Sequence, residues 1–239
     1  MAMRLSQFLV TATLLVATNA WAVEGSLTLT GATDYRYRGI SQTAGDPAIQ
    51  GSFDLAWASG FYTGVWASNV DFGDDADIEV DWYGGYSWEI GDSIGLDLMA
   101  NYYTYPGYSG DADYLELIAN LEVSDFAFQY AYAYDFFNTG DPAHYLSASY
   151  SYEIAEKAGV FEGISLDLHY GFSFGDYWDR WDIGDYSDYS IGISSSWSRV
   201  DISLAWLDNS VSHIELIPGG AYRNDSTVLF TLSSTFGLF

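Results

Sequence analysis

The chain has 239 residues, a little over the length of one average domain. Its 33 Asp and Glu against 7 Lys and Arg give a formal net charge of -26. So acidic a chain excludes binding to nucleic acid or to an anionic membrane surface through a basic patch. Aromatic residues make up 18% of the sequence, which argues against disorder, and the absence of cysteine excludes a disulfide framework and a thiolate metal site.

The first 22 residues have the pattern of a secretory signal peptide. Arg4 supplies the positive start, residues 8–17 form the apolar stretch, and Ala20-Trp21-Ala22 matches a cleavage site with small residues. The alternative is an N-terminal anchor helix, but the apolar stretch is too short to cross a hydrocarbon core of about 30 Å. We therefore expect a cleaved signal peptide at 1–22 and one mature domain at 23–239.

From residue 23 onward, apolar and polar residues alternate with a period of two. In 78–89, one face would carry Ile78, Val80 and Trp82, and the other Glu79 and Asp81. A strand gathers those carboxylates on one side, whereas a helix would scatter them. The same pattern predicts twelve strands, at about 26–37, 48–57, 61–70, 78–89, 94–105, 113–123, 126–136, 143–153, 164–174, 186–197, 200–208 and 226–239.

Most of these segments are ten to twelve residues long, which matches the ~9–11 residues of a tilted strand that crosses a bilayer. Short turns alternate with long polar links, as in bacterial outer-membrane barrels with short periplasmic turns and long outer loops. Residues 154–163 break this rule, because they are long but fall on the short-turn side, and a short interfacial helix is one interpretation.

Side-chain type along the predicted strands gives a second indication of a lipid-facing surface. Aliphatic residues such as Leu166, Leu168 and Leu204 lie mid-strand, and aromatic residues such as Trp88 and Trp197 lie at strand ends. Aromatic girdles are typical of barrels in lipid. We predict an all-β fold, a transmembrane up-and-down antiparallel β-barrel of twelve strands in the outer membrane of a Gram-negative bacterium, with a soluble all-β sandwich or barrel as the alternative.

Four segments also resemble a known protein family. Residues 33–43, which read TDYRYRGISQT, together with 46–51, 60–71 and 79–86, resemble the TorF-type porins of the proteobacterial Gcw_chp family, although Thr33 stands where that family is expected to have Ser. The resemblance implies an outer-membrane barrel of the porin kind. It implies no particular solute.

If the apolar residues of each strand face lipid, the residues that alternate with them line the lumen. The residues predicted to line a pore are Asp34, Arg36, Arg38, Gln50, Asp54, Glu79, Asp81, Asp97, Asn101, Glu116, Glu122, Asp135, Asp167, His169, Asp188 and Asp201. Rings of carboxylates favour cations, so the prediction is a porin-like channel for passive diffusion of small solutes with a preference for cations. The alternative is a non-conducting structural or lipid-interacting barrel. Arg36 and Arg38 fit equally a constriction or a structural ion-pair network.

Enzymatic catalysis has little support in the sequence. There is no G-x-S-x-G, and no nucleophile is evident beside His144, while His169 is expected on the lumen wall and His213 in a loop. An outer-membrane hydrolase is therefore the weakest alternative. We expect no catalytic residue, no resident metal and no cofactor. The expected partners are outer-membrane lipid and lipopolysaccharide, the barrel-assembly machinery, and small solutes or ions, with divalent cations possible at the acidic outer loops around Asp75 and Asp179.

Overall fold

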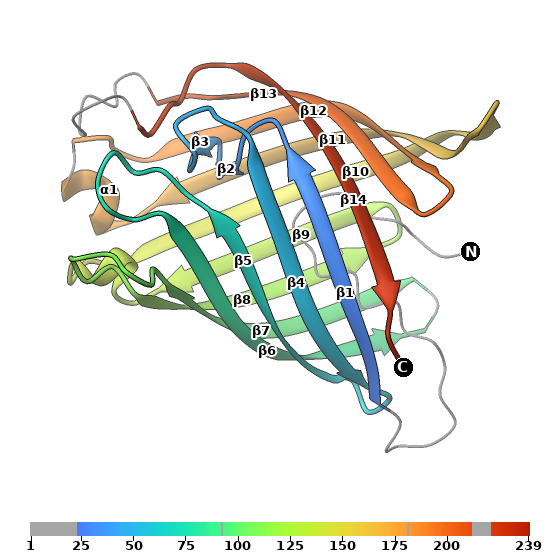
Figure 1. Cartoon of the computed structure of the whole chain (residues 1–239), viewed down its shortest axis with the longest axis horizontal. Coiled ribbons are helices and arrows are strands. Elements are labelled where there is room, and N and C mark those ends of the chain that lie inside the picture. The colour runs from blue at the N-terminus through green and yellow to red at the C-terminus, as the bar shows by residue number, and fades with distance from the viewer. Residues whose placement is uncertain (1–22, 92, 181, 212–220) are drawn as a thin grey trace.

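The structure is a computed structural model that describes residues 23–91, 93–180, 182–211 and 221–239; the predicted signal peptide lies outside these residues. Within them, twelve strands form one closed antiparallel barrel, in which each strand pairs with its neighbours in sequence and the last with the first (Figure 1). The strands are β1 (Val23–Ala32), β4 (Ala48–Trp57), β5 (Phe61–Asn69), β6 (Ile78–Ile90), β7 (Ile94–Thr104), β8 (Tyr114–Val123), β9 (Phe126–Ala133), β10 (Ala143–Ala158), β11 (Phe161–Phe174), β12 (Tyr186–Trp197), β13 (Val200–Asn209) and β14 (Thr227–Gly237). The predicted fold class is confirmed.

Short elements complete the fold. A two-stranded hairpin, β2 (Arg36–Tyr37) and β3 (Ile40–Ser41), forms a separate sheet, and η1 (Phe136–Asn138) and α1 (Asp176–Arg180) are single helical turns. In the described part of the chain, no helix has both the length and the apolar character to cross a membrane.

Burial alternates along the wall strands as the sequence pattern predicts. In β6, Glu79, Asp81 and Tyr83 are 2%, 7% and 6% exposed, whereas Trp82, between Asp81 and Tyr83, is 57% exposed. The outward face of the barrel therefore carries large apolar side chains, and the inward face carries the polar ones. This inversion of the usual soluble pattern favours a lipid-facing exterior over the soluble alternative.

The connections differ in length between the two rims. Five turns of no more than three residues lie at one rim, and six longer links, which include the β2–β3 hairpin, lie at the other. The interfacial helix considered for 154–163 is wrong. β10 and β11 instead continue beyond the barrel as a long hairpin that turns at Gly159, with a register shift between Glu153 and Ala155.

The first predicted strand needs a correction. β1 ends at Ala32, and residues 33–47, here called the inner loop, leave the wall and fold back between β1 and β4. At its tip, Arg38 and Gly39 both have positive φ (49° and 81°), which lets the chain reverse between β2 and β3. Asp34, Arg36 and Arg38 therefore do not belong to the barrel wall.

The loops at the long-link rim share a buried aromatic core. Tyr35 of the inner loop, Phe72, Tyr105, Phe136 and Trp178 are each at most 5% exposed and belong to one cluster. Phe72 stacks on Tyr222 with ring centroids 5.0 Å apart, so the link before β14 joins the same core. Aromatic packing from six links thus fixes the loops over this end of the barrel.

The last strand closes the barrel against the first. β14 pairs with β1 from Ala32–Thr231 to Ser26–Gly237. Beyond this, Leu238 N–H donates to Gly25 O (2.8 Å), and Gly25 N–H donates to Phe239 O (3.2 Å), so one residue of β1 faces two of the C-terminus. This bulge brings the Phe239 ring over Gly25, on the same parity as the outward Leu27, where a Cβ would lie 2.6 Å from the ring. Phe239 therefore lies on the outer face of the barrel, where it is 69% exposed.

Candidate functional site: the acidic lumen

The wall strands bring most of the predicted lumen residues to one inner surface. The following occupy inward positions by strand parity: Gln50, Asp54, Glu79, Asp81, Asp97, Asn101, Glu116, Glu122, Asp167, His169, Asp188 and Asp201. Of these, Glu116 is fully buried, and Glu79, Asp81, Asn101 and Asp188 are at most 7% exposed. The most buried positions lie toward the inner loop and the long-link rim.

Asp135, like the three inner-loop residues, lies outside the barrel wall. β9 ends at Ala133, so Asp135 lies beyond the strand, where its Oδ1 accepts a bond from Gly140 N–H at 2.6 Å. It shapes the turn around η1. The placement of Asp135 on the inner wall is therefore wrong.

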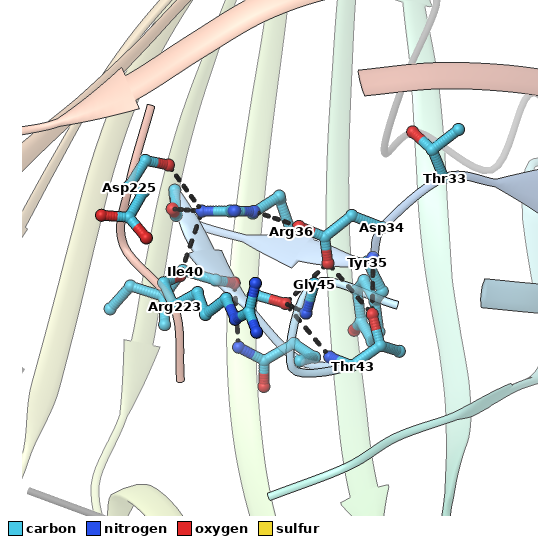
Figure 2. Close-up of polar contacts among 12 residues, drawn as sticks. Thr33, Asp34, Tyr35, Arg36, Ile40, Thr43, Gly45, Arg223 and Asp225 are labelled. Atoms are coloured by element: carbon cyan, nitrogen blue, oxygen red, sulfur yellow. Dashed lines mark hydrogen bonds and ion pairs between the residues drawn. The ribbon is translucent and has the colours of Figure 1, made fainter. Parts of the chain in front are cut away.

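Arg36 and Asp34 anchor the inner loop to the segment that directly precedes β14. Arg36 Nε donates to Asp34 Oδ2 (2.5 Å), and Nη1 donates to the carbonyl oxygens of Arg223 (3.0 Å) and Asp225 (3.2 Å), as Figure 2 shows. Asp34 Oδ1 in turn accepts bonds from Ser41 and Thr43. For Arg36, the interpretation as a structural network is the one that these contacts support.

A small cavity of about 280 Å³ lies beside this network. Its lining includes Thr33, Asp34 and Arg36 on the inner-loop side and Arg223 and Asp225 on the other. Arg223 rests against Gly45, where a Cβ would meet its side chain at 3.1 Å. The cavity mixes both signs of charge, and its groups largely satisfy one another.

Arg38 makes a different set of contacts, because it reaches across the lumen to the opposite wall. Its Nη2 donates to Glu116 Oε1 of β8 at 2.7 Å, and its guanidinium carbon lies 4.5 Å and 4.4 Å from the ring centroids of Tyr37 and Tyr145. Burial lowers the pKa of Arg38, but Glu116 and the tyrosines around the guanidinium together outweigh burial and raise the pKa well above the usual range. The inner loop thus crosses the barrel and is pinned by an ion pair at its far side.

Most other lumen carboxylates are held by neutral donors. Tyrosine hydroxyls donate from Tyr35 to Glu79 (2.9 Å), from Tyr62 to Asp97 (2.7 Å) and from Tyr103 to Glu116 (3.1 Å), and Tyr83 donates to Asp54. Asn120 Nδ2 adds a second bond to Asp97 at 3.0 Å. These donors hold the carboxylates in place and bring no positive charge with them, whereas Glu116 is also paired with the cationic Arg38.

His169 lies in a polar cluster on the β10–β12 wall. Its Nδ1 is 2.8 Å from Ser149 Oγ, and its Nε2 is 2.9 Å from Tyr145 Oη and 3.1 Å from Asp188 Oδ1. If Ser149 were a nucleophile, its base would be His169, whose other ring nitrogen contacts both the Tyr145 hydroxyl and the Asp188 carboxylate. We find no pair of backbone donors in these contacts that would form an oxyanion hole.

Metal ligation has no geometric support in the ranges that the structure describes, where no three His, Asp or Glu side chains converge. In the outer loops, Asp75 Oδ1 accepts a bond from Ser109 N–H (3.2 Å), and Asp74 Oδ1 accepts one from Ala76 N–H (2.9 Å). These acids therefore brace loop backbone.

The tyrosines Tyr35, Tyr103 and Tyr145 are among the lumen residues that the sequence interpretation missed. Tyr103 and Tyr145 share the inward parity with Asn101 and Ser147, so the alternation itself could have identified them. Tyr35 lies on the inner loop, and its pairing with Glu79 depends on a fold that no local pattern encodes.

Comparisons with known proteins agree with this geometry. A family described as "Bacterial protein of unknown function (Gcw_chp)" matches residues 16–236. Among solved structures, the NanC porin is similar with a TM-score of 0.57 and 11% identity, covering 89% of this chain and all of that one. The KdgM porin is similar with a TM-score of 0.52 and 6% identity, covering 90% of this chain and 99% of that one. These likenesses establish the fold. No curated protein matches the sequence.

Proposed function

The chain belongs to the Gcw_chp family of bacterial proteins, and we propose that it is an outer-membrane, porin-like channel for the passive diffusion of small solutes, with a preference for cations. The observation that carries the proposal is a closed twelve-stranded barrel with large apolar side chains outside and carboxylates inside. Lipid cannot satisfy the backbone groups of an open sheet, and closure removes every edge. The resemblance of residues 33–86 to TorF-type porins supports the same function.

The expected cation preference follows from the balance of charge in the lumen. Carboxylates at Asp54, Asp97 and Asp167 accept bonds from hydroxyl groups, which carry no charge. Arg36 and Arg38 neutralise their partners Asp34 and Glu116. The remaining carboxylates lower the electrostatic energy of a cation in the lumen and raise that of an anion.

The inner loop supports a second candidate function, that of a non-conducting barrel. Together with the aromatic core of the long links, it fills the lumen at one rim, and this occlusion favours a non-conducting barrel. A barrel of twelve strands lies between those that side chains fill and those that leave a wide aqueous channel. The acidic inner wall nevertheless favours passage, because a structural barrel gains nothing from so many uncompensated charges.

The partners and the route to the membrane complete the proposal. Residues 1–22 would direct export, after which the barrel-assembly machinery would insert the mature chain, with the long links outside the cell and lipopolysaccharide around the outer rim. Acidic outer loops would meet lipopolysaccharide through divalent cations.

Single-channel recording in a planar bilayer tests the function. We expect discrete conductance steps in KCl and, under a salt gradient, a reversal potential of the sign that K⁺ preference gives. The preference should decrease with rising ionic strength, because salt screens the carboxylates. Silent bilayers with correctly folded protein would identify the non-conducting barrel, and an anion-selective reversal potential would refute the cation preference.

A further inference from the structure

The side chain of Arg38 occupies a binding cage built by two wall strands and by its neighbour Tyr37. The cage consists of Glu116 on β8, Tyr37 on the inner loop and Tyr145 on β10. Glu116 is fully buried, and its Oε2 also accepts bonds from Tyr103 (3.1 Å) and Tyr37 (3.4 Å), so the carboxylate is held in place from two sides. The cage is therefore preorganised around one cationic group.

The chemistry of the cage suits a planar guanidinium better than an ammonium ion. A guanidinium can lie against aromatic faces while it donates in its own plane to a carboxylate, and an ammonium ion has no such plane. Arg38 shows this arrangement, with two ring contacts below 5 Å and one charge-assisted bond of 2.7 Å.

Arg38 does not use all the bonds that the cage offers. Its Nη1 is buried without a hydrogen-bond partner, and so is Asp188 Oδ2, whose other oxygen lies 3.3 Å from the Tyr145 hydroxyl. Arg38 also has a φ of 49°, which is unfavourable for a residue with a side chain. An unused acceptor beside the cage and an imperfect internal occupant are what an exchangeable site requires.

Release of Arg38 does not require the inner loop to unfold. The loop backbone is anchored on the other side of the lumen, where Asn209 Nδ2 donates to Gly39 O (3.0 Å) and Arg36 donates to the carbonyl of Arg223. The side chains of Arg38 and Tyr37 bridge the space between this anchored backbone and the β8–β10 wall, and of these two Arg38 carries the ion pair. A change of its rotamers would open that space and leave the cage free.

We infer that the cage of Glu116, Tyr37 and Tyr145 is a selectivity site for solutes that carry a guanidinium group, and that Arg38 is its internal, exchangeable occupant. The inference rests on the proposed channel function and names its solute class. A permeating guanidinium displaces Arg38, binds transiently and leaves, and in its absence Arg38 restores the ion pair.

The test compares block of the K⁺ current by arginine and by lysine, which have the same charge but different head groups. In the native protein, arginine should block at about tenfold lower concentration than lysine, the ratio that one additional contact of this kind provides. Arg38→Ala removes the internal competitor and should lower the half-blocking concentration of arginine by about tenfold more, with lysine little changed. Arg38→Ala combined with Glu116→Gln should abolish the arginine preference.

Two controls separate the cage from general acidity. Asp97→Asn should weaken block by arginine and lysine alike and leave their ratio unchanged, because Asp97 lies outside the cage. Arg180→Gln removes an arginine of the loop rim, paired with Asp141, and should change neither. Where Arg38→Ala does not assemble, the ratio in the native protein against that in Glu116→Gln decides.

Equal block by arginine and lysine in the native protein and in Arg38→Ala would overturn the inference while the channel function stands. So would an arginine preference that survives Glu116→Gln. A protein that conducts nothing would refute the channel, and the cage would then be tested by thermal unfolding of Arg38→Ala in detergent. There, millimolar arginine should raise the unfolding temperature above the value in lysine, and equal temperatures would refute the site.

Discussion

A charge placed on the outward face should cost stability according to its depth in the bilayer, and β13 provides a series of positions for this test. Leu204 lies mid-strand, is 54% exposed and is flanked by Ile193 and Phe230 on the adjacent strands. Each residue of a tilted strand adds about 2.5 Å of height, so Val200 lies about 10 Å from Leu204, close to the edge of an apolar band about 25 Å tall.

Leu204→Arg should therefore lower the free energy of unfolding by about 2–4 kcal/mol, and Val200→Arg by about 0–1 kcal/mol. The chain already carries an exposed arginine, Arg199, next to Val200, which agrees with a small cost at that rim. Leu204→Ala is the matched control, because it shortens the side chain without adding charge.

Reversible urea unfolding in lipid vesicles, followed by tryptophan fluorescence, measures these differences. The depth argument requires the cost at Leu204 to exceed that at Val200 by more than 1 kcal/mol. Equal costs at the two positions, or a cost of Leu204→Arg no larger than that of Leu204→Ala, would show that this face does not contact hydrocarbon.

The remaining predictions concern orientation, selectivity and closure. Cysteines in the long links should react with a membrane-impermeant reagent on intact cells and cysteines in the short turns should not, and the reverse labelling would invert the topology; suitable pairs are Asp75 and Asp179 against Gly91 and Ser124. Glu122→Gln with Asp97→Asn should reduce the K⁺ preference at low salt by removing two inward carboxylates, and an unchanged reversal potential would mean that the inner wall does not set selectivity. Deletion of 236–239 should abolish assembly because it removes Phe239 and its pairing with Gly25, and normal heat-modifiable migration on gels would contradict this.

The strands that have lipid on one face and the lumen on the other were predictable from the sequence. The bounds 48–57 and 186–197 agree with β4 and β12 as observed, because lipid on one face and a polar lumen on the other impose the alternation residue by residue. The pattern also placed the inward carboxylates, since strand parity alone decides which way they point.

The inner loop was not predictable by the same reasoning. Residues 34–38 continue the alternation, but a short hairpin inside the lumen is as extended as a wall strand, so the period cannot distinguish them. The contacts that pull it inward join Arg36 to Asp225 and Arg38 to Glu116, both remote in sequence. Residues 154–163 misled for another reason: their Ala, Glu and Lys favour helix, but pairing with the neighbouring strand prevails over local propensity.

The tyrosine hydroxyls that hold the lumen carboxylates have a consequence for how ions would distribute. A carboxylate paired with arginine becomes part of a neutral unit, whereas a phenol that donates to a carboxylate, as Tyr62 does to Asp97, brings no opposing charge. A water-filled space with immobile charge of one sign behaves like an ion-exchange resin in Donnan equilibrium with the outside solution. At low salt its mobile ions are then almost entirely counter-ions, and a divalent cation is enriched as the square of the factor that enriches a monovalent one.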